Sequence, residues 1–429
     1  MSSIRRRDFL KASGLAAFSF PFPLVSLGGF QKRAGKPVLV VLYLRGGMDP
    51  LNVVVPYGHS RYYAIRPTIA IQPKATADEK GVLVLNKKLG LHPALAPIEP
   101  LYRSKMFAPV LGVGSPHPTR SHFDAQDFME YAAPGNRTLR QGWLNRYLSL
   151  SASDKDSELR AVALQNLLPR ALRGEYPVLA VGPERRRDKT DQLLDLFDEL
   201  YGKDGGPDPQ GGDARRVAKG RAKRMERNED PVLASGRATI KSLRRFREIQ
   251  RREGRRSQVR YPTRGLGPKL QGIARVIKSG EDIQVAGADW NGWDHHTGEG
   301  AEDGRMAQML GNLAGSIAAF YQDIGPDAER TVLLTMSEFG RTCRENGNRG
   351  TDHGHGGIML AFGGPVRGGR ILGRFEGLED KDLYQGRDLP VSTDFRNVFN
   401  EILVKHMGFK TPRGFFPDYK PGKGIGLIG

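Results

Sequence analysis

The sequence is almost without cysteine, since Cys343 is the only one in 429 residues. A single cysteine excludes an internal disulfide and a metal cage built from cysteines. Any metal that this chain binds must therefore be held by His, Asp or Glu. The nine histidines show where to look for such a site.

Acidic residues are fewer than basic ones: the chain has 47 Asp and Glu and 66 Lys and Arg, which gives a formal net charge of +19. The excess is local: residues 214–256 contain 16 Lys or Arg and five Asp or Glu and so carry +11 of it. This stretch follows a Gly-, Pro- and Asp-rich linker at 202–213, and the pattern predicts one or two solvated helices inserted into the main domain at about 202–260. Contact with an anionic polymer or another envelope partner is an alternative use of that surface. Aromatic residues are nearly absent from it, so we expect no nucleic-acid partner.

The N-terminal segment lacks a long unbroken apolar run. Residues 12–30 carry no charge but are interrupted by Pro21, Pro23 and Gly28-Gly29, which makes them a poor membrane span. A basic block precedes them, and this is the layout of a signal peptide. The block contains the residues typical of twin-arginine signals, a receptor-read export address, namely Arg6, Arg7, Phe9, Leu10 and Lys11.

We therefore expect residues 1–34 to be a signal peptide with a linker. The expected partner is the twin-arginine translocation machinery, and the expected location is the periplasm or the cell surface. No clean Ala-x-Ala cleavage site closes the apolar segment. Retention of an N-terminal anchor is the alternative to cleavage.

Short apolar runs alternate with helical patterns through residues 35–429. Residues 38–44 are continuously apolar, which predicts a strand buried on both faces, and similar runs occur at 108–113, 178–181, 331–336 and 358–362. Residues 302–324 show helical spacing, and Ser392-Thr393-Asp394 caps a further amphipathic helix. The alternation predicts an α/β fold with a mostly parallel central sheet flanked by helices. In such sheets, sites form beyond the carboxyl ends of the strands.

Two polar clusters follow early apolar runs. Gly46-Gly47-Met48-Asp49 comes directly after the first strand, where Asp49 is either a turn residue or a cation ligand. The second cluster, residues 119–127, enters a helix. Its Ser121 hydroxyl either caps that helix or stands where amide dipoles favour a nucleophile.

Two later clusters combine carboxylates with imidazoles. Asp294 and His296 lie close to two tryptophans and offer one metal a carboxylate and an imidazole. Glu338 ends the run 331–336, and Asp352 and His353 follow after a Gly- and Asn-rich loop. An ordinary loop histidine is an alternative interpretation of His355, but it does not extend to the whole set. The whole set predicts a metal site.

The ordered motifs resemble the DUF1501 family of exported bacterial proteins, whose name records an unknown function. The motifs that carry the resemblance are Leu44-Arg45-Gly46-Gly47-Met48-Asp49, Arg120-Ser121-His122-Phe123, Gly142-Trp143-Leu144, Trp293-Asp294-His295-His296, Ser337-Glu338-Phe339-Gly340-Arg341 and Gly350-Thr351-Asp352-His353-Gly354. The family is grouped with the alkaline phosphatase and sulfatase superfamily. The resemblance therefore implies an alkaline phosphatase-like core with one or two metal ions at the strand ends.

Residue roles also follow from the resemblance. It implies Asp49 as the first metal ligand and Ser121 as the nucleophile, and it implies that His295 is not a ligand. The remaining metal ligands would be Asp294, His296, Glu338, Asp352 and His353. Two features depart from the superfamily: Glu338 takes the strand-end place of an Asp-His pair, and Ser121-His122 matches no nucleophile motif closely.

The expected function is that of an exported metal-dependent hydrolase acting on phosphate or sulfate esters. The metal would be zinc, calcium, magnesium or manganese. Ser121 or a metal-bound water would attack, Arg120 or Arg341 would offset charge on the transferred group, and His122 would act as acid or base. The alternative is a non-catalytic, metal-stabilised binding or assembly protein of the cell envelope.

Overall fold

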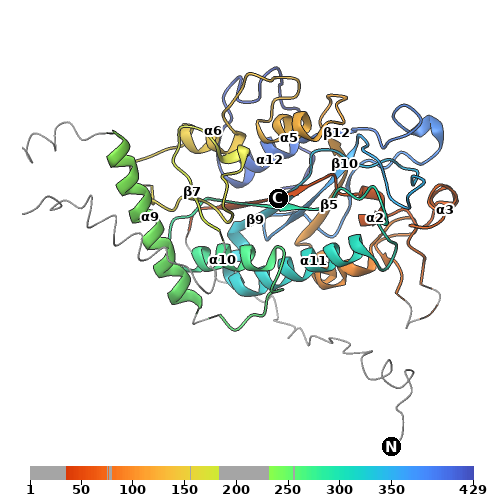
Figure 1. Cartoon of the computed structure of the whole chain (residues 1–429), viewed down its shortest axis with the longest axis horizontal. Coiled ribbons are helices and arrows are strands. Elements are labelled where there is room, and N and C mark those ends of the chain that lie inside the picture. Colours follow the sequence, from red (N-terminus) through yellow and green to blue (C-terminus); the bar gives the residue numbers. More distant parts are fainter. Residues whose placement is uncertain (1–34, 75, 77–79, 155, 183–230, 255–256) are drawn as a thin grey trace, which may run out of the picture. The chain divides into compact units, whose positions relative to one another are not determined.

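The described part of the chain is arranged around one large sheet (Figure 1). The computed structural model describes residues 35–74, 76, 80–154, 156–182, 231–254 and 257–429. Within these residues the sheet has nine strands in the order β11-β5-β10-β9-β1-β8-β6-β7, with β12 also paired to β5. Their bounds are β1 Val38–Arg45, β5 Phe107–Gly114, β6 Ala161–Ala163, β7 Leu179–Ala180, β8 Val285–Asn291, β9 Thr331–Met336, β10 Gly357–Phe362, β11 Leu372–Gly373 and β12 Thr393–Asp394.

The strands run parallel with one exception. Strand β1 pairs in parallel with β8 on one side and β9 on the other, and β8, β6 and β7 continue in the same direction. Strand β10 is antiparallel to both β9 and β5, so β5 points the same way as β9. The predicted α/β fold with a mostly parallel sheet is confirmed.

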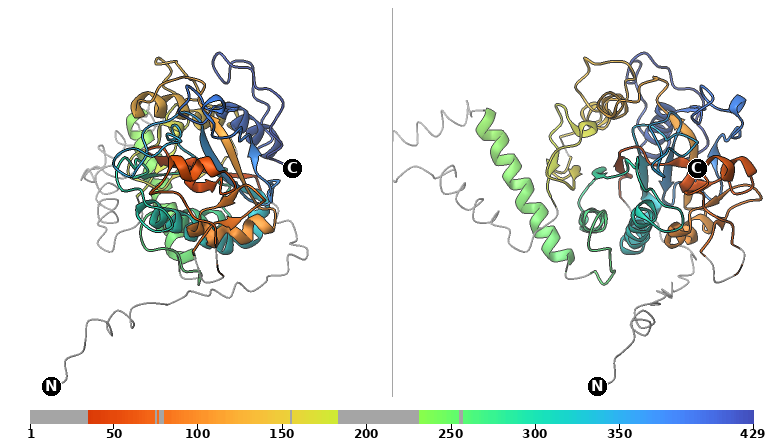
Figure 2. Two further views of the ribbon diagram at one scale, coloured as in Figure 1. Left: turned by 90° about the vertical axis from the view of Figure 1, so that its right-hand side faces the viewer. Right: turned by 45° about the vertical axis from the view of Figure 1, so that its right-hand side comes forward.

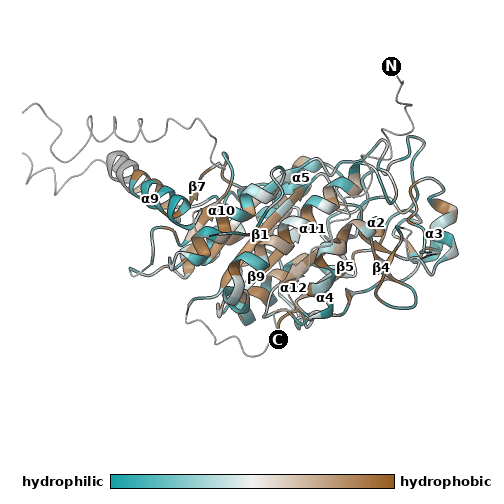
Figure 3. Cartoon of the chain, turned by 90° about the horizontal axis from the view of Figure 1, so that it is seen from below, coloured by the Kyte–Doolittle hydropathy of each residue, from teal (hydrophilic) through white to brown (hydrophobic). Residues whose placement is uncertain are grey.

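Helices cover both faces of the sheet, because β1 is apolar on both (Figures 1 and 2). Val38, Val40 and Leu42 pack with the core that contains α10 (Gly267–Lys278) and α11 (Arg305–Ile324). Leu39 and Val41 pack with the opposite core, which contains α6 (Trp143–Leu150) and α12 (Phe395–Glu401). The hydropathy colouring of Figure 3 shows the central strands as the most apolar part of the molecule. Burial of this kind stabilises the fold by about 1.5–3 kcal/mol for each large apolar side chain.

The long helix α11 has the apolar face that its spacing predicts. Its periodic residues Met306, Leu310, Leu313, Ile317, Phe320 and Ile324 are all buried. The capped helix α12 likewise begins where the sequence indicates, since the Asp394 side chain accepts a hydrogen bond from the backbone N–H of Arg396.

Smaller elements surround the sheet. A second sheet has the order β2-β4-β3, formed by β2 Val54–Val55, β4 Gly90–Leu91 and β3 Leu83–Val84. The short helices are α2 Pro50–Val53, α3 Ser60–Ile65, α4 Glu99–Arg103 and α5 His122–Glu130, together with the helical turns η1 Pro93–Ile98, η2 Arg170–Leu172, η3 Gly325–Arg330, η4 Asp380–Asp382 and η5 Ile402–His406.

The predicted basic insertion is described only in part, because residues 183–230 lie outside the described residues. Helix α9 (Pro231–Gly254) is not a wholly solvated helix, since Phe246 and Ile249 are buried in the core that α10 also lines. A fully solvated insertion is therefore a wrong description of this segment. An anionic-polymer partner for its basic surface stays a prediction.

The predicted signal peptide, residues 1–34, also lies outside the described residues. Within the described part of the chain, no helix has both the length and the apolar character needed to cross a membrane.

Candidate metal centre

One edge of the sheet collects the loops that carry the predicted site residues. Parallel strands β1, β8, β9 and β5 end at this edge. The loops that follow them contain Asp49, Asp294, Glu338 and Ser121 respectively. Because β10 is antiparallel, its amino end lies at the same edge, and His353 precedes it there.

Three side chains meet at the centre of this edge. The Oδ1 atom of Asp294 lies 3.0 Å from Nε2 of His296 and 3.3 Å from Nε2 of His353. The two Nε2 atoms are 2.9 Å apart. Ligands about 2.0–2.1 Å from a tetrahedral zinc lie roughly 3.3 Å from one another, so this spacing suits one small cation.

His122 completes the group from the opposite side of the same carboxylate. Its Nε2 atom lies 3.3 Å from Oδ2 of Asp294. Within the described residues, ligand atoms of His122, Asp294 and His353 all lie within 4.8 Å of one another. The side chains of these residues are partly exposed, so a ligand from solvent can reach them.

Each of the three histidines turns Nε2 toward Asp294 and Nδ1 toward another oxygen. The Nδ1 partners are Oε1 of Glu338 for His122 at 2.9 Å, Oδ1 of Asp352 for His296 at 3.0 Å, and the carbonyl of Arg120 for His353 at 2.9 Å. An oxygen at Nδ1 favours the tautomer with its proton there and leaves the Nε2 lone pair free. Metal-binding histidines are oriented by partners of this kind.

Glu338 supports the group from behind. Its Oε1 atom accepts hydrogen bonds from the backbone N–H of Gly46 at 2.8 Å and from Nε2 of Gln126 at 3.0 Å. Burial alone would raise the pKa of Glu338, but its hydrogen bonds, above all with His122, hold that pKa below its usual value. The hydrogen bond with Glu338 is also the main cause that raises the pKa of His122. Glu338 therefore orients His122 and is not itself one of the converging atoms.

Asp352 has the same supporting position toward His296. Besides His296, its Oδ1 atom accepts a hydrogen bond from Nδ2 of Asn346 at 3.0 Å. The hydrogen bond from Asn346 is the main cause that lowers the pKa of Asp352, and the bond with His296 adds to it. Glu338 and Asp352, both predicted as metal ligands, lie one step behind the converging atoms.

Arg341 is buried beneath the site and joins the loops that form it. Its guanidinium donates to the carbonyls of Gly46, Gly47 and Thr351 at 2.6–2.9 Å, and it pairs with the Asp294 carboxylate. This ion pair lowers the pKa of Asp294 against the opposing effect of burial. A fully buried guanidinium with these partners is not placed to meet a transferred group, so the role predicted for Arg341 is corrected to positioning Asp294.

Gly46 is required where the first strand meets this loop. Its φ is +125°, and a Cβ there would lie 2.4 Å from the backbone nitrogen of Asp294. Only glycine tolerates both the backbone conformation and the contact. The close approach lets the β1 and β8 loops lie side by side.

Asp49 does not join the cluster. It is buried and pairs with the buried Arg66, which donates to Oδ1 at 3.0 Å and makes a second, shorter contact with Oδ2. Burial would raise the pKa of Asp49, but Arg66 outweighs that effect and lowers it. The expected first metal ligand is therefore placed in a buried ion pair, because a cation from 17 residues further along the chain already occupies both of its oxygens.

The remaining predicted residues flank the cluster. The Arg120 guanidinium forms an ion pair with Asp388 at 2.6 Å, and the backbone carbonyl of Arg120 contacts Nδ1 of His353. Ser121 is exposed at the N-cap of α5, and its side chain makes no capping bond to the helix. His295 is buried, and its ring Nε2 has no hydrogen-bond partner among the described residues.

Sequence reasoning missed several supporting residues. Gln126 lies four residues after His122 on α5, and that helical spacing was an available signal for a shared face. Arg66 and Asn346 carry no comparable signal in the sequence. Phe339 packs against the rings of His122 and His353, with centroids 4.9 and 4.8 Å apart.

The fold and these contacts define an α/β protein with a His- and Asp-lined candidate metal centre at the carboxyl edge of its sheet. The chain belongs to the family described as "Protein of unknown function (DUF1501)", whose model matches residues 111–413. The converging residues all lie inside the matched range, whereas Asp49 lies outside it. No curated protein matches the sequence.

Several solved structures are similar to the chain at low sequence identity. They include the C-terminal periplasmic domain of EcEptC from Escherichia coli in complex with Zn, with 8% identity over 77% of this chain and 74% of that one and a TM-score of 0.36. Ps i-CgsB in complex with k-i-k-neocarrahexaose has 11% identity over 89% and 74% of the two chains and a TM-score of 0.33. The PsFucS1 sulfatase from Pseudoalteromonas sp. has 11% identity over 80% and 66% and a TM-score of 0.30. TM-scores this low support no inference about activity.

Proposed function

We propose that this protein is a divalent-metal-dependent hydrolase of phosphate or sulfate esters. The observation that carries the proposal is the common orientation of His122, His296 and His353, whose Nε2 atoms face Asp294 while each Nδ1 is held by an oxygen. The three histidines are only partly buried, so water could satisfy their ring nitrogens. The fold therefore does not need their common orientation for stability alone.

The donor set narrows the choice of metal. Imidazole nitrogens suit zinc and other transition metals, whereas calcium and magnesium prefer oxygen ligands. Two imidazoles with one carboxylate, or three imidazoles if His122 is a ligand, therefore favour zinc over calcium, magnesium and manganese. When bound, such an ion supplies Lewis-acid polarisation of an ester oxygen.

Ser121, which directly precedes His122 in the chain, is the nucleophile of this proposal. Its hydroxyl makes no capping bond, and it precedes His122 at the start of α5, where unpaired backbone N–H groups favour negative charge. Its oxygen would form a bond to phosphorus or sulfur while the bond to the departing alcohol breaks, and that alcohol takes up the serine proton. Water then releases the serine ester as free phosphate or sulfate.

His122 could serve either as a metal ligand or as an acid-base group, and the two roles exclude each other. As a ligand it would use Nε2 on the cation, whereas as an acid or base it would exchange a proton there. A His122→Ala variant that loses metal identifies the ligand role, and one that keeps metal but loses hydrolysis identifies the acid-base role.

The proposal is tested by metal analysis of the purified protein together with hydrolysis of p-nitrophenyl phosphate and p-nitrophenyl sulfate. We expect bound metal, and hydrolysis that is lost on chelation and in Ser121→Ala. Bound metal with no hydrolysis of any ester would instead favour the metal-stabilised binding or assembly protein. Absence of metal would overturn both.

We also propose that the protein acts in the periplasm or at the cell surface after twin-arginine export. The support is the motif Arg6-Arg7-x-Phe9-Leu10-Lys11 ahead of an uncharged segment. Replacing Arg6 and Arg7 by Lys should leave the full chain in the cytoplasmic fraction, and unchanged fractionation would overturn the proposal.

A further inference from the structure

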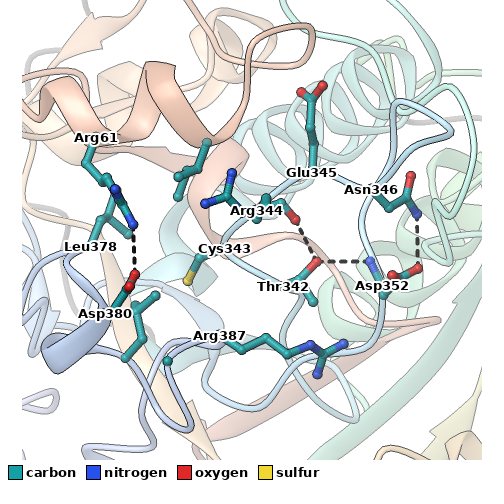
Figure 4. Close-up of a pocket in the computed structure, with 13 residues that line it drawn as sticks. Arg61, Thr342, Cys343, Arg344, Glu345, Asn346, Asp352, Leu378, Asp380 and Arg387 are labelled. Carbon is teal, nitrogen blue, oxygen red and sulfur yellow. Dashed lines mark hydrogen bonds and ion pairs between the residues drawn. The ribbon is translucent and has the colours of Figure 1, made fainter.

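A cavity of about 210 Å³, lined by both apolar and charged side chains, lies beside the candidate metal centre (Figure 4). Its wall includes Thr342, Arg344 and Glu345 on one side and Arg387 on another. Asp352 belongs to both sites, since it lines the cavity and also accepts the hydrogen bond from Nδ1 of His296. Pockets for whole small-molecule ligands usually exceed about 300 Å³, so this cavity has room for one substituent of a larger ligand.

The carboxylates of the cavity are already satisfied by the protein. Glu345 accepts hydrogen bonds from the backbone N–H and the hydroxyl of Thr68, both at 3.0 Å. Asp380 pairs with Arg61 at 2.7 Å. Asp352 is held by Asn346 and His296. All three acids thus accept hydrogen bonds from the protein, and Asp380 is in addition paired with an arginine.

In the part of the chain that the structure describes, two of the three arginines that line the cavity have no close ion pair of their own. Within the described residues, the Arg344 guanidinium makes no ion pair or hydrogen bond. Arg387 reaches only Asp388, at 3.3 Å, and that carboxylate is already bound more closely by Arg120, at 2.6 Å. In Figure 4 the Arg387 side chain extends toward Asp352. The lining is balanced in formal charge, with three arginines and three acids, but within the described residues Arg344 and Arg387 keep guanidinium N–H donors free for an anionic group.

We propose that this cavity binds a second anionic group of the substrate through Arg344 and Arg387. The inference rests on the proposed function and names its substrate class: a phosphate or sulfate ester whose alcohol part carries another phosphate, sulfate or carboxylate. The scissile ester lies at the histidine cluster, and the second group enters the cavity past Asp352. Guanidinium groups recognise such anions through paired hydrogen bonds, which neutral substituents do not offer.

The test compares binding of glucose 1,6-bisphosphate and glucose 1-phosphate to the full protein by calorimetry. We expect the bisphosphate to bind more tightly, and Arg344→Gln and Arg387→Gln each to weaken its binding by about tenfold with little change for the monophosphate. Arg103→Gln is the matched control, since Arg103 is an exposed arginine on α4, before the amino end of β5. Equal affinity for the two esters, or an equal loss for both in the variants, would overturn the inference.

Folding of the variants is checked by thermal melting. Arg344 is exposed and without a described partner, so Arg344→Gln keeps the test open even where Arg387→Gln fails to fold. The two proposals fail separately. An arginine-dependent preference in calorimetry without hydrolysis of any ester supports the cavity and removes the hydrolase, whereas hydrolysis of both esters without a preference removes the cavity alone.

Discussion

His296 and His353 present their Nε2 atoms to each other at 2.9 Å, while the Nδ1 atom of each is held by an oxygen at 2.9–3.0 Å. Two ring nitrogens at this distance either share one proton or face one cation. The carboxylate of Asp294, within 3.3 Å of both, favours a cation between them.

Removing either central histidine should release the metal. We expect His296→Ala and His353→Ala to be purified with little bound metal, because each loses one of the converging nitrogens. His355→Ala is the control, since its ring stacks on Tyr384 with centroids 4.3 Å apart and takes no part in the cluster. Elemental analysis by mass spectrometry measures the difference, and equal metal in all three would exclude this centre.

Asp352→Asn should weaken metal binding without abolishing it. Asp352 orients His296 through Nδ1 and does not contribute a converging atom, so we expect an affinity loss of about 10–100-fold. Competition with a chromophoric zinc chelator measures this value. Complete loss of metal would show that Asp352 is itself a ligand.

Arg341→Met should destabilise the fold by about 3 kcal/mol or more, because the carbonyls of Gly46, Gly47 and Thr351 lose their buried hydrogen-bond donor. Urea denaturation measures the free energy of unfolding, and Arg103→Met is the exposed control. A change as small as in the control would contradict the positioning role of Arg341.

Asp49→Asn distinguishes the buried ion pair from a metal ligand. The variant removes the carboxylate that pairs with the buried Arg66, which keeps its hydrogen bonds to Asn52 and to the carbonyls of Thr342 and Cys343. It should lose about 3 kcal/mol of stability, while the folded fraction keeps its metal. Stability and metal content are measured on the same preparation. Full stability together with lost metal would restore Asp49 as a ligand.

His295 should make stability fall in acid. Burial lowers the pKa of His295 to about 4 from 6.5, so the unfolded chain binds this proton more readily than the folded one. Stability is therefore lost as the pH falls from about 6.5 toward 4, by up to about 3 kcal/mol for this group.

A His295→Gln variant isolates the contribution of His295 to this loss of stability in acid. Urea denaturation of both proteins at neutral pH and near pH 4.5 should show a smaller acid loss in the variant. Parallel pH profiles would show that His295 does not carry the effect.

Much of the fold is predictable because its elements depend on local patterns. The run 38–44 and the helical spacing of 302–324 follow from burial of one or both faces, and the elements formed are β1 at Val38–Arg45 and α11 at Arg305–Ile324. Strand β8 was not predicted, because Val285 and Trp290 are its only large apolar residues and the polar Asp289 and Asn291 stand among its last three. Its position beside β1 became evident only from the pairing.

The sequence by itself determined the α/β class, the strand-end location of the polar clusters and the residue types available to a metal. Only the tertiary structure decided which of these residues converge. The antiparallel direction of β10 brings His353 to the edge where Asp294 lies, and Arg66 withdraws Asp49 from it. The physical reason is that strands and helices follow from neighbours a few residues apart, whereas the partner of a buried charge is chosen by packing between distant segments.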